Sequence, residues 1–356
     1  MSRKTNPIRT LLSPSKILIP ILIGLIVVAV LLVNNFDKDA FEQINWSYYT
    51  AFWLFLSLLF MAVRDIAYMY RIRVLTNNEL SWRRAFDVIF LWEFASSVTP
   101  SIVGGAPIAI FIINKEGINL GRSTTIVLIT SLLDEIFFIT MVPLLYFFVF
   151  DKNLFPVDEP LSLMQFEAGS KVVFIMSYIL IVFYCCFISF GLFINPKGFK
   201  YLLIQLFRLP LLRKWKAEAE KTGDEIIIAS GEVKKWPAIQ WFKAFIATYF
   251  SWTARYFVVN CLIMAFLFTN EHFLIYARQL IMWVIMLISP TPGSSGVAEY
   301  AFSAYLFEFI PNGLEATLAL LWRLVSYYPY LFIGAILLPG WVKRVYIKRK
   351  LIKFKS

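Results

Sequence analysis

Six long runs of apolar residues constrain this chain more than any other feature. They cover residues 17–33, 49–69, 124–150, 172–194, 238–268 and 317–339. A helix of about 17 to 25 mostly apolar residues can cross the hydrocarbon core of a bilayer. Inside that core every backbone N–H and C=O must be hydrogen bonded within the protein, which restricts spanning segments to helices and closed barrels. Runs of this length predict an all-α polytopic membrane protein.

The composition supports a membrane protein over a nucleic-acid-binding protein. Hydrophobic residues make up 59% of the chain and charged residues only 16%, far from the average of soluble domains. The formal net charge is +11. Its lysines and arginines gather in loops beside the apolar runs, where positive charge sets membrane orientation and attracts anionic lipid headgroups. We therefore expect the membrane, and no nucleic acid, as a partner.

Two further apolar stretches, 85–113 and 274–310, are each interrupted by a Pro/Gly motif. The first motif reads VTPSIVGGAP and the second reads SPTPGSSGVAE. They lie 192 residues apart (292 − 100), and an arginine precedes each one by a similar distance, Arg64 by 36 residues and Arg255 by 37. Interrupted segments at matching positions in two halves of a membrane protein indicate the binding site of a transporter. The pairs at this offset are Pro100 and Pro292, Gly104 and Gly296, Gly121 and Gly313, and Thr125 and Thr317.

The charges of the loops predict how the interrupted stretches run. Residues 1–16 are basic, 37–42 acidic, and 197–235 and 343–355 basic again. If 85–113 crossed the membrane once, the acidic loop near Asp158 would be cytoplasmic and the basic segment 197–235 external, against the positive-inside rule. Residues 85–98 also form only about 21 Å of helix, short of the roughly 30 Å core. Both stretches are therefore predicted to be re-entrant hairpins.

The predicted architecture is an inverted-topology repeat with about six full spans and two re-entrant helical hairpins. Each half consists of span, span, hairpin and span, and the second half has every direction reversed. We expect an inner-membrane protein with both termini in the cytoplasm. The predicted segments are a basic tail 1–16, a first repeat 17–150 with hairpin 85–113, an external loop and span 151–194, a cytoplasmic amphipathic connection 195–236, the remainder of the second repeat 237–342 with hairpin 274–310, and a basic tail 343–356.

The two hairpin tips are predicted to meet at the bilayer midplane and to bind a ligand. Non-helical backbone at this depth occurs only where protein buries it or where it lines a water-filled cavity. After each tip a new helix begins, so its free N–H groups and positive dipole end would attract an anion. The alternative is a packing break that binds nothing. The predicted tip ligands are Pro100, Ser101, Gly104, Gly105, Pro292, Gly293, Ser294, Ser295 and Gly296.

Three arginines within apolar stretches, Arg64, Arg255 and Arg323, are predicted to bind the substrate. Charged side chains are costly inside a membrane and mostly face the protein interior or water. Arg64 could instead extend to the membrane surface. Four acids are predicted to be charge partners or proton carriers, namely Glu93, Asp134, Glu135 and Glu299, the last of which could simply cap a helix.

Sequence motifs of enzymes are absent. The chain has no GxxxxGK[ST] phosphate-binding loop, no HExxH motif and no paired CxxC motifs, and its single histidine, His272, falls at the end of a span. We therefore predict no catalytic residue, no metal ligand and no cofactor.

The two motifs in order resemble the transmembrane region of the lysylphosphatidylglycerol synthase family, a flippase-like integral membrane domain. The resemblance rests on SSVTPSIVGGAPIAIFIINKEGI with LLDEI, and on SPTPGSSGVAEYAF with ALLWRLVSYYP, and covers about 15–345. It implies re-entrant helices and the handling of anionic phospholipids or lipid-linked intermediates. Family synthases add a soluble aminoacyltransferase domain, whose activity we do not expect of this chain. The first tip has Gly105-Ala106 where the family pattern has Gly-Glu.

Three classes of function remain open from the sequence. The first is a lipid translocase for an anionic phospholipid or lipid-linked intermediate, passive or ion-coupled. The second is an intramembrane enzyme or accessory subunit acting on a polyprenyl- or phospholipid-linked substrate. The third is a scaffold that recruits a cytoplasmic or membrane synthase as partner. The paired motifs favour the translocase.

Overall fold

A computed structural model describes most of the chain. It covers residues 42, 46–99, 105–149, 152–156, 161–163, 166–209, 213–286, 297–311 and 314–347. The predicted first span at 17–33, the N-terminal tail, the C-terminal tail beyond residue 347 and most of the two Pro/Gly motifs lie outside these residues. The rest comprises both halves of the predicted repeat.

Four helices of the described residues belong to the first half. Three of them begin at a polar N-cap, where Ser47, Ser81 and Asn119 each accept a hydrogen bond from a backbone N–H three residues later. The helices are α4 (Tyr48–Leu75), α5 (Trp82–Val98), α6 (Ala106–Lys115) and α7 (Leu120–Phe148).

A small hairpin, a long apolar helix and a group of surface helices lie between these four helices and the rest of the second half. Helix α10 docks onto the start of α7, where the backbone N–H of Gly121 donates to the Glu225 carboxylate at 2.8 Å. The elements are β1 (Leu161–Leu163), β2 (Phe166–Ala168), α8 (Ser170–Ser189), the π-helix η1 (Phe190–Ile194), α9 (Pro196–Leu206), η2 (Arg213–Trp215) and α10 (Lys216–Lys234). The two strands pair antiparallel, with Leu161 opposite Ala168.

The second half repeats the order of helix lengths in the first, a long helix followed by two short ones. Its elements are α11 (Ala238–Phe266), α12 (His272–Met286), α13 (Val297–Leu306), η3 (Phe307–Phe309), α14 (Glu315–Ser326), α15 (Tyr328–Val342) and η4 (Lys343–Ile347).

The protein is an all-α membrane protein. Four helical segments of the described chain are long and apolar enough to span a bilayer, namely Tyr48–Leu75, Leu120–Phe148, Ser170–Ile194 and Thr317–Val345. They coincide with four of the six predicted spans. The fifth, α11, is as long as α7 but is not among these four segments.

The predicted span 317–339 is broken into two helices. Helix α14 ends at Ser326, and α15 begins after Tyr327, whose backbone has φ −129° and ψ −55°. Pro329 causes this break, because proline has no N–H to donate and its ring clashes with the carbonyl four residues earlier. The break places Tyr327 and Tyr330 at mid-length, where both reach the protein centre.

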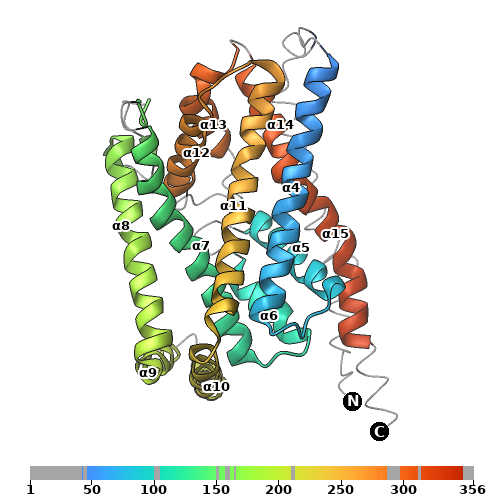
Figure 1. The fold of residues 1–356 in the computed structure, drawn as a ribbon. Coiled ribbons are helices and arrows are strands. Elements are labelled where there is room, and N and C mark those ends of the chain that lie inside the picture. Colours follow the sequence, from blue (N-terminus) through green and yellow to red (C-terminus); the bar gives the residue numbers. More distant parts are fainter. Residues whose placement is uncertain are drawn as a thin grey trace, which may run out of the picture.

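The two pairs of short helices, α5 with α6 and α12 with α13, lie toward opposite ends of the molecule (Figure 1). We call the end that carries α9 and α10 the lower end, and the end that carries β1 and β2 the upper end. Helices α5 and α6 extend from the lower end to mid-height, and α12 and α13 from the upper end. Their 17, 10, 15 and 10 residues correspond to about 25 Å of helix or less. That they re-enter a membrane stays a prediction.

Helix packing crosses between the halves. The long helices α4 and α11 form the most extensive contact, side by side through the centre. Helix α5 packs on α15, and α12 packs on α7, so each short-helix pair contacts the last helix of the other half.

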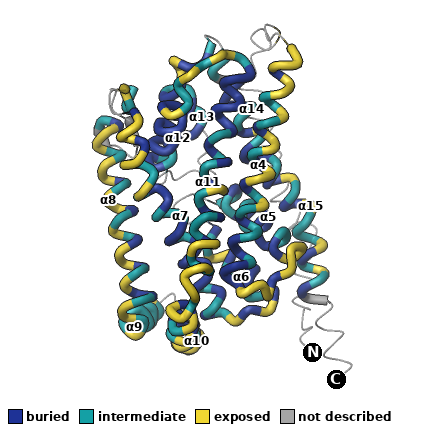
Figure 2. Tube along the Cα trace, in the orientation of Figure 1, coloured by how far each residue is buried: buried dark blue, intermediate teal, exposed yellow. Residues whose placement is uncertain are grey.

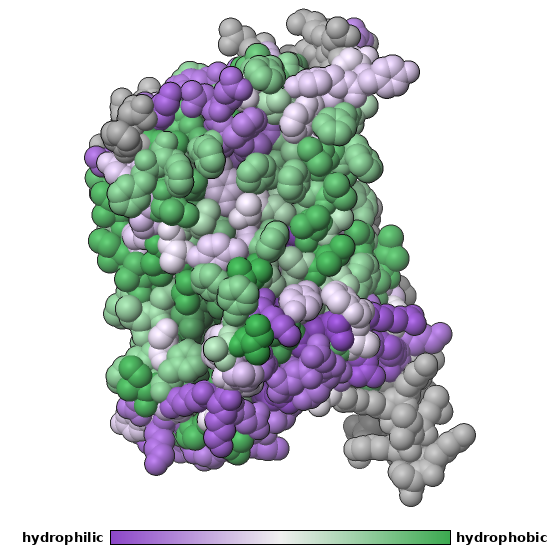
Figure 3. Space-filling view, viewed as in Figure 1, coloured by the Kyte–Doolittle hydropathy of each residue, from purple (hydrophilic) through white to green (hydrophobic). Residues whose placement is uncertain are grey.

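The outer surface matches a membrane environment. Figure 2 shows mainly exposed and half-buried residues along α8 and buried residues around α12 and α11. Figure 3 shows a broad hydrophobic band at mid-height with hydrophilic residues concentrated at both ends. Large exposed apolar side chains on α4 and α8 contribute to this band, among them Phe52, Phe55, Met176, Ile179 and Phe183. Such a continuous apolar surface would be a liability in water, and lipid is its natural solvent.

We predict that Gly334→Ala destabilises the protein by about 1–3 kcal/mol through overpacking. A Cβ at Gly334 on α15 would lie 2.3 Å from the Cβ of Phe94 on α5, so the two helices would have to move apart. Gly340→Ala on the same helix is the control, because a Cβ there has no atom within 4 Å. Thermal unfolding in detergent measures both, and equal transition temperatures for the two variants would contradict this packing.

Candidate functional site

A cavity of about 380 Å³ lies at mid-height between the two halves. Its walls come from helices of both halves, including α4, α5 and α7 of the first and α11, α12 and α14 of the second. Charged side chains are concentrated here, although the surrounding helices are apolar. The charged lining residues are Arg64, Arg71, Glu93, Asp134, Glu135, Arg255 and Arg323.

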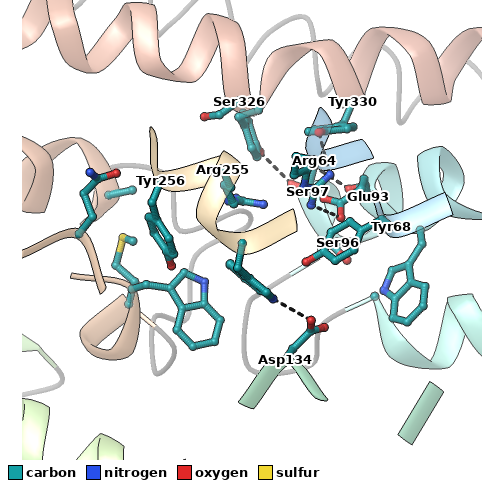
Figure 4. A pocket seen from close by; sticks show the side chains of 18 of the residues that line it. Arg64, Tyr68, Glu93, Ser96, Ser97, Asp134, Arg255, Tyr256, Ser326 and Tyr330 are labelled. Atoms are coloured by element: carbon teal, nitrogen blue, oxygen red, sulfur yellow. Dashed lines mark hydrogen bonds and ion pairs between the residues drawn. The ribbon is translucent and has the colours of Figure 1, made fainter. Parts of the chain in front are cut away.

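Arg64 is the centre of a buried charge cluster (Figure 4). Its side chain is 1% exposed and donates hydrogen bonds to Asp65 at 2.8 Å, Glu93 at 2.5 Å and the Tyr330 hydroxyl at 2.7 Å. Its guanidinium also lies 4.3 Å from the ring centroid of Tyr68, a cation–π contact. Arg64 therefore faces the protein interior and joins α4, α5 and α15.

Arg71 forms a second cluster with Asp134 of α7. The two side chains make a bidentate ion pair, and Arg71 also donates to the Thr248 hydroxyl at 3.0 Å. The Trp252 indole N–H donates to the same Asp134 carboxylate at 2.7 Å. The predicted span 49–69 ends before Arg71 and so leaves this arginine outside the membrane segment. Helix α4 continues to Leu75, however, and Arg71 lies two turns after Arg64 on the same helix face.

Arg323 and Glu299 form a third pair, between α14 and α13. Their side chains are 7% and 14% exposed and lie 2.7 Å apart. The guanidinium of Arg323 also contacts the rings of Trp322 and Tyr327, at 5.2 Å and 4.7 Å from their centroids. Glu299 thus neutralises an arginine of the cavity, a role that helix capping would not provide.

Arg255 on α11 differs from the other three cavity arginines. It is half-buried and lies 5.6 Å from the ring centroid of Trp252, but it makes no hydrogen bond or ion pair with any described residue. The repeat explains this difference. At the offset of 191 that relates Arg64 to Arg255, Asp65 corresponds to Tyr256; at the offset of 192, Glu93 corresponds to Ile285. Both carboxylates that neutralise Arg64 are therefore missing around Arg255.

Glu135 also lacks a partner, in contrast to its neighbour Asp134. Its Oε2 atom is buried and has no hydrogen-bond partner among the described residues. Adjacent residues project about 100° apart on a helix, so Glu135 cannot share the Arg71 site that holds Asp134. The two acids thus have different surroundings, one fixed in an ion pair and one unpaired at the edge of the cavity.

The two halves contribute equivalent positions to the cavity wall. At offsets of 191 or 192 residues, lining residues of the first half correspond to lining residues of the second. The pairs are Arg64 and Arg255, Tyr68 and Val259, Ala106 and Ala298, Ser131 and Arg323, Asp134 and Ser326, and Glu135 and Tyr327. Arginine is present in both halves only at Arg64 and Arg255; in the other charged pairs the equivalent residue is serine or tyrosine. The cavity wall is therefore asymmetric in its electrostatics.

Gly105 is the one predicted tip residue that the structure describes. It is buried, lines the cavity and precedes α6 as its N-cap. A Cβ there would lie 2.2 Å from Ser96 Oγ and 2.9 Å from the Trp92 ring, so only glycine allows the α6 start to approach α5 this closely. The predicted residues outside the described chain are Pro100, Ser101, Gly104, Pro292, Gly293, Ser294, Ser295 and Gly296.

The structure therefore brings together every predicted charged site residue. Arg64, Arg255, Arg323, Glu93, Asp134 and Glu135 line one cavity, and Glu299 contacts it through Arg323. Sequence reasoning missed Arg71 and the aromatic lining. Within the described residues, no group of three or more His, Cys, Asp or Glu side chains could hold a metal ion.

Comparison with known proteins agrees with the pattern of motifs. The family model of the lysylphosphatidylglycerol synthase TM region matches residues 17–334. The chain belongs to this family. It is also 25% identical over 352 residues to a UPF0104 membrane protein of Archaeoglobus fulgidus, with 94% of this chain and 100% of that protein covered. No solved structure matches. Membership in the family establishes that this chain is a membrane domain but does not specify an activity.

We predict that Asp134→Leu destabilises the protein by about 3–5 kcal/mol, because the buried guanidinium of Arg71 loses its counter-charge. The double variant Arg71→Met with Asp134→Leu should recover much of this loss, since it leaves no unpaired charge behind. Thermal unfolding of both variants provides the comparison. The exposed pair of Arg122 and Glu79 is the control, and Glu79→Ala should change stability by less than about 1 kcal/mol. Equal losses in the single and double variants would contradict a role for charge compensation.

Proposed function

We propose that this protein is a lipid translocase that binds the anionic headgroup of a phospholipid or lipid-linked intermediate in the central cavity. One observation carries the proposal. Three of the four cavity arginines have carboxylate partners, whereas Arg255 has no partner among the described residues. The sequence predicts substrate binding by Arg64, Arg255 and Arg323 together. We now expect Arg255 to contact the substrate directly and the paired arginines to have a supporting role.

The electrostatic argument follows from the low dielectric of a membrane protein. An unpaired guanidinium at this depth loses hydration and gains no compensating attraction, so it is costly until an anion arrives. A phosphate or phosphodiester supplies that anion and can accept two parallel hydrogen bonds from arginine. The helices that start at the cavity would add partial positive charge. Gly105 and Ala106 of α6 and Ala298 of α13 all line it.

The size of the cavity favours a headgroup over a whole lipid. At about 380 Å³ it falls at the lower end of the range of small-molecule pockets. The lipid's chains would remain in the bilayer against the apolar outer surface while the headgroup enters between the halves. Aromatic rings from both halves would exclude water around it, including Trp92, Trp252, Trp283 and Trp322.

Energy coupling would involve Glu135 and not Asp134. Asp134 is held by Arg71 and the Trp252 indole, so releasing it would leave a buried cation unpaired. Glu135 has a buried oxygen without a hydrogen-bond partner among the described residues, which favours a carboxyl group that gains and loses a proton. The chain has no phosphate-binding loop for ATP, so transport would be passive or driven by an ion.

The geometry favours transport over the alternative of an intramembrane enzyme or accessory subunit. Such an enzyme needs two carboxylates that converge on a metal or a reacting group. Here Asp134 is bound to Arg71, and Glu135 projects elsewhere.

We further propose that the lower end faces the cytoplasm of an inner membrane, because the connection around α9 and α10 is rich in lysine and arginine. A cytoplasmic or membrane synthase that supplies or uses the lipid is a proposed partner.

The first test of this function uses the purified protein in liposomes with a headgroup-labelled anionic phospholipid. Arg255→Gln should lower the translocation rate about 10-fold or more, because it removes a charge-assisted contact worth roughly 1.5–3 kcal/mol. Arg122→Gln, a surface arginine, is the matched control and should translocate like the unaltered protein. Unchanged translocation by Arg255→Gln would overturn the assignment of the site.

Glu135→Gln tests the coupling separately. The amide cannot exchange a proton, so translocation by this variant should no longer depend on a pH difference across the liposome membrane. The measurement is the same headgroup assay with and without an imposed pH gradient. A pH dependence that survives in Glu135→Gln would exclude this residue as the proton carrier and would leave the Arg255 result unaffected.

A further inference from the structure

A partly buried ion-pair network lies at the lower end, away from the cavity. Arg344 in η4, directly after α15, donates to Asp87 of α5 at 2.7 Å and to Glu116 at the end of α6 at 2.5 Å. The Glu116 side chain is 2% exposed and also accepts a hydrogen bond from the Trp341 indole at 2.8 Å. We call Arg344, Asp87 and Glu116 the lower latch. It joins both limbs of the first short-helix pair to the end of α15.

A corresponding network lies at the upper end. Arg278 of α12 has a side chain that is 1% exposed and pairs with Glu308 in η3 at 2.9 Å. It also donates two hydrogen bonds, at 2.7 Å and 3.0 Å, to the carbonyl oxygen of Asn153, which follows α7. We call Arg278, Glu308 and Asn153 the upper latch. It joins both limbs of the second short-helix pair to the end of α7.

The two latches occupy equivalent places in the repeat. Glu308 lies 192 residues after Glu116 (308 − 116), the same offset that relates the Pro/Gly motifs. Residues 152 and 153 lie 192 before residues 344 and 345. Each latch therefore connects the short-helix pair of one half to the last helix of the other half. Surface pairs such as Lys200 with Asp224 make no connection of this kind.

We propose that the two latches are alternate gates of the central cavity, each one controlling access from its own end. The inference rests on the proposed function and specifies how its site is opened. The short helices that a latch holds also line the cavity, through Trp92 and Glu93 of α5 and through Met282 of α12. The helices to which they are tied line it as well, through Asp134 of α7 and Tyr330 of α15. Releasing one latch separates two of the cavity walls at one end only.

The chemistry of the two latches differs in one respect. The lower latch crosses between the halves through two carboxylates, whereas the upper latch crosses through a neutral carbonyl oxygen and keeps its ion pair within one short-helix pair. Both are closed in this structure. In each latch the arginine makes most of the polar contacts between the halves. Trp341 also donates across the lower joint, and Lys152 pairs with Glu271 near the upper one, so replacing the arginine weakens the joint and leaves the rest of the site in place.

The test measures access to the cavity from each side of a vesicle membrane. Cys185, Cys186 and Cys261 are replaced by serine, and Ser326→Cys places a reporter in the cavity wall. A membrane-impermeant maleimide is then added to one side. Arg344→Gln should raise the labelling rate from the lower end by at least about fivefold, and Arg278→Gln should do the same from the upper end. About fivefold is the low end of the coupling usually found between two sites of one protein, here the latch and the cavity.

Two sets of variants keep the test interpretable. Asp224→Asn removes an exposed ion pair and should leave labelling unchanged from both sides. Arg344→Lys and Arg278→Lys retain the positive charge and should return labelling toward the level of the parent protein, which a merely misfolded site would not do. Labelling that rises from the same side in both glutamine variants, or in neither of them while both remain folded in gel filtration, would overturn the proposal.

The outcome is independent of the lipid assay, because labelling needs no substrate. If the two glutamine variants raise labelling from opposite sides of the membrane but no lipid moves, the gates are retained and the translocase is overturned. Lipid movement that depends on Arg255, together with no shift in labelling, would retain the translocase and overturn the gates.

Discussion

Four buried arginines determine how the helices of this protein meet. A guanidinium remains charged at any accessible pH, so each one must find acceptors when it leaves water. Arg64 finds them on α4, α5 and α15, Arg71 on α7 and α11, Arg323 on α13, and Arg278 on η3, on α13 and in the segment after α7. Helices in a membrane gain little from apolar contact with one another, because lipid is equally apolar. Polar contacts of this kind can therefore specify which helices become neighbours.

The same constraint gives the cavity its asymmetry. The repeat places equivalent residues around it, and a symmetric set of charges would neutralise or expose both halves alike. Instead Arg64 has two carboxylate partners, and Arg255 has Tyr256 and Ile285 at the equivalent positions. The arginine of the first half is neutralised, and the equivalent arginine of the second half is not. Two differences between the repeats thus separate a paired arginine from an unpaired one.

Much of the architecture could be predicted from the sequence, because a bilayer restricts what an apolar run can do. Four described spans and the short helices around both motifs followed from run length and position. Arg71 was wrongly placed outside the membrane segment, because an arginine that follows an apolar run can lie either in a loop or on a continuation of the helix. Only the observed length of α4 distinguishes the two cases. The break at Tyr327 required attention to Pro329, which a hydropathy pattern ignores. The sequence predicted Glu93, Asp134 and Glu299 as charge partners, but it could not assign each acid to its arginine, since most of these contacts join residues 24 to 266 positions apart.

The sequence by itself determined the solvent, the class of fold, the family and most of the charged residues that line the cavity. Those properties depend on local composition and on motifs at a fixed offset, both of which can be read from the amino-acid sequence alone. Only the tertiary structure decided which charges neutralise one another, which arginine stays open, and which helices the two latches join. These are long-range contacts in a medium of low dielectric, where a separation of a few ångströms decides whether a charge is compensated. The sequence records the charges, and the fold sets the distances between them.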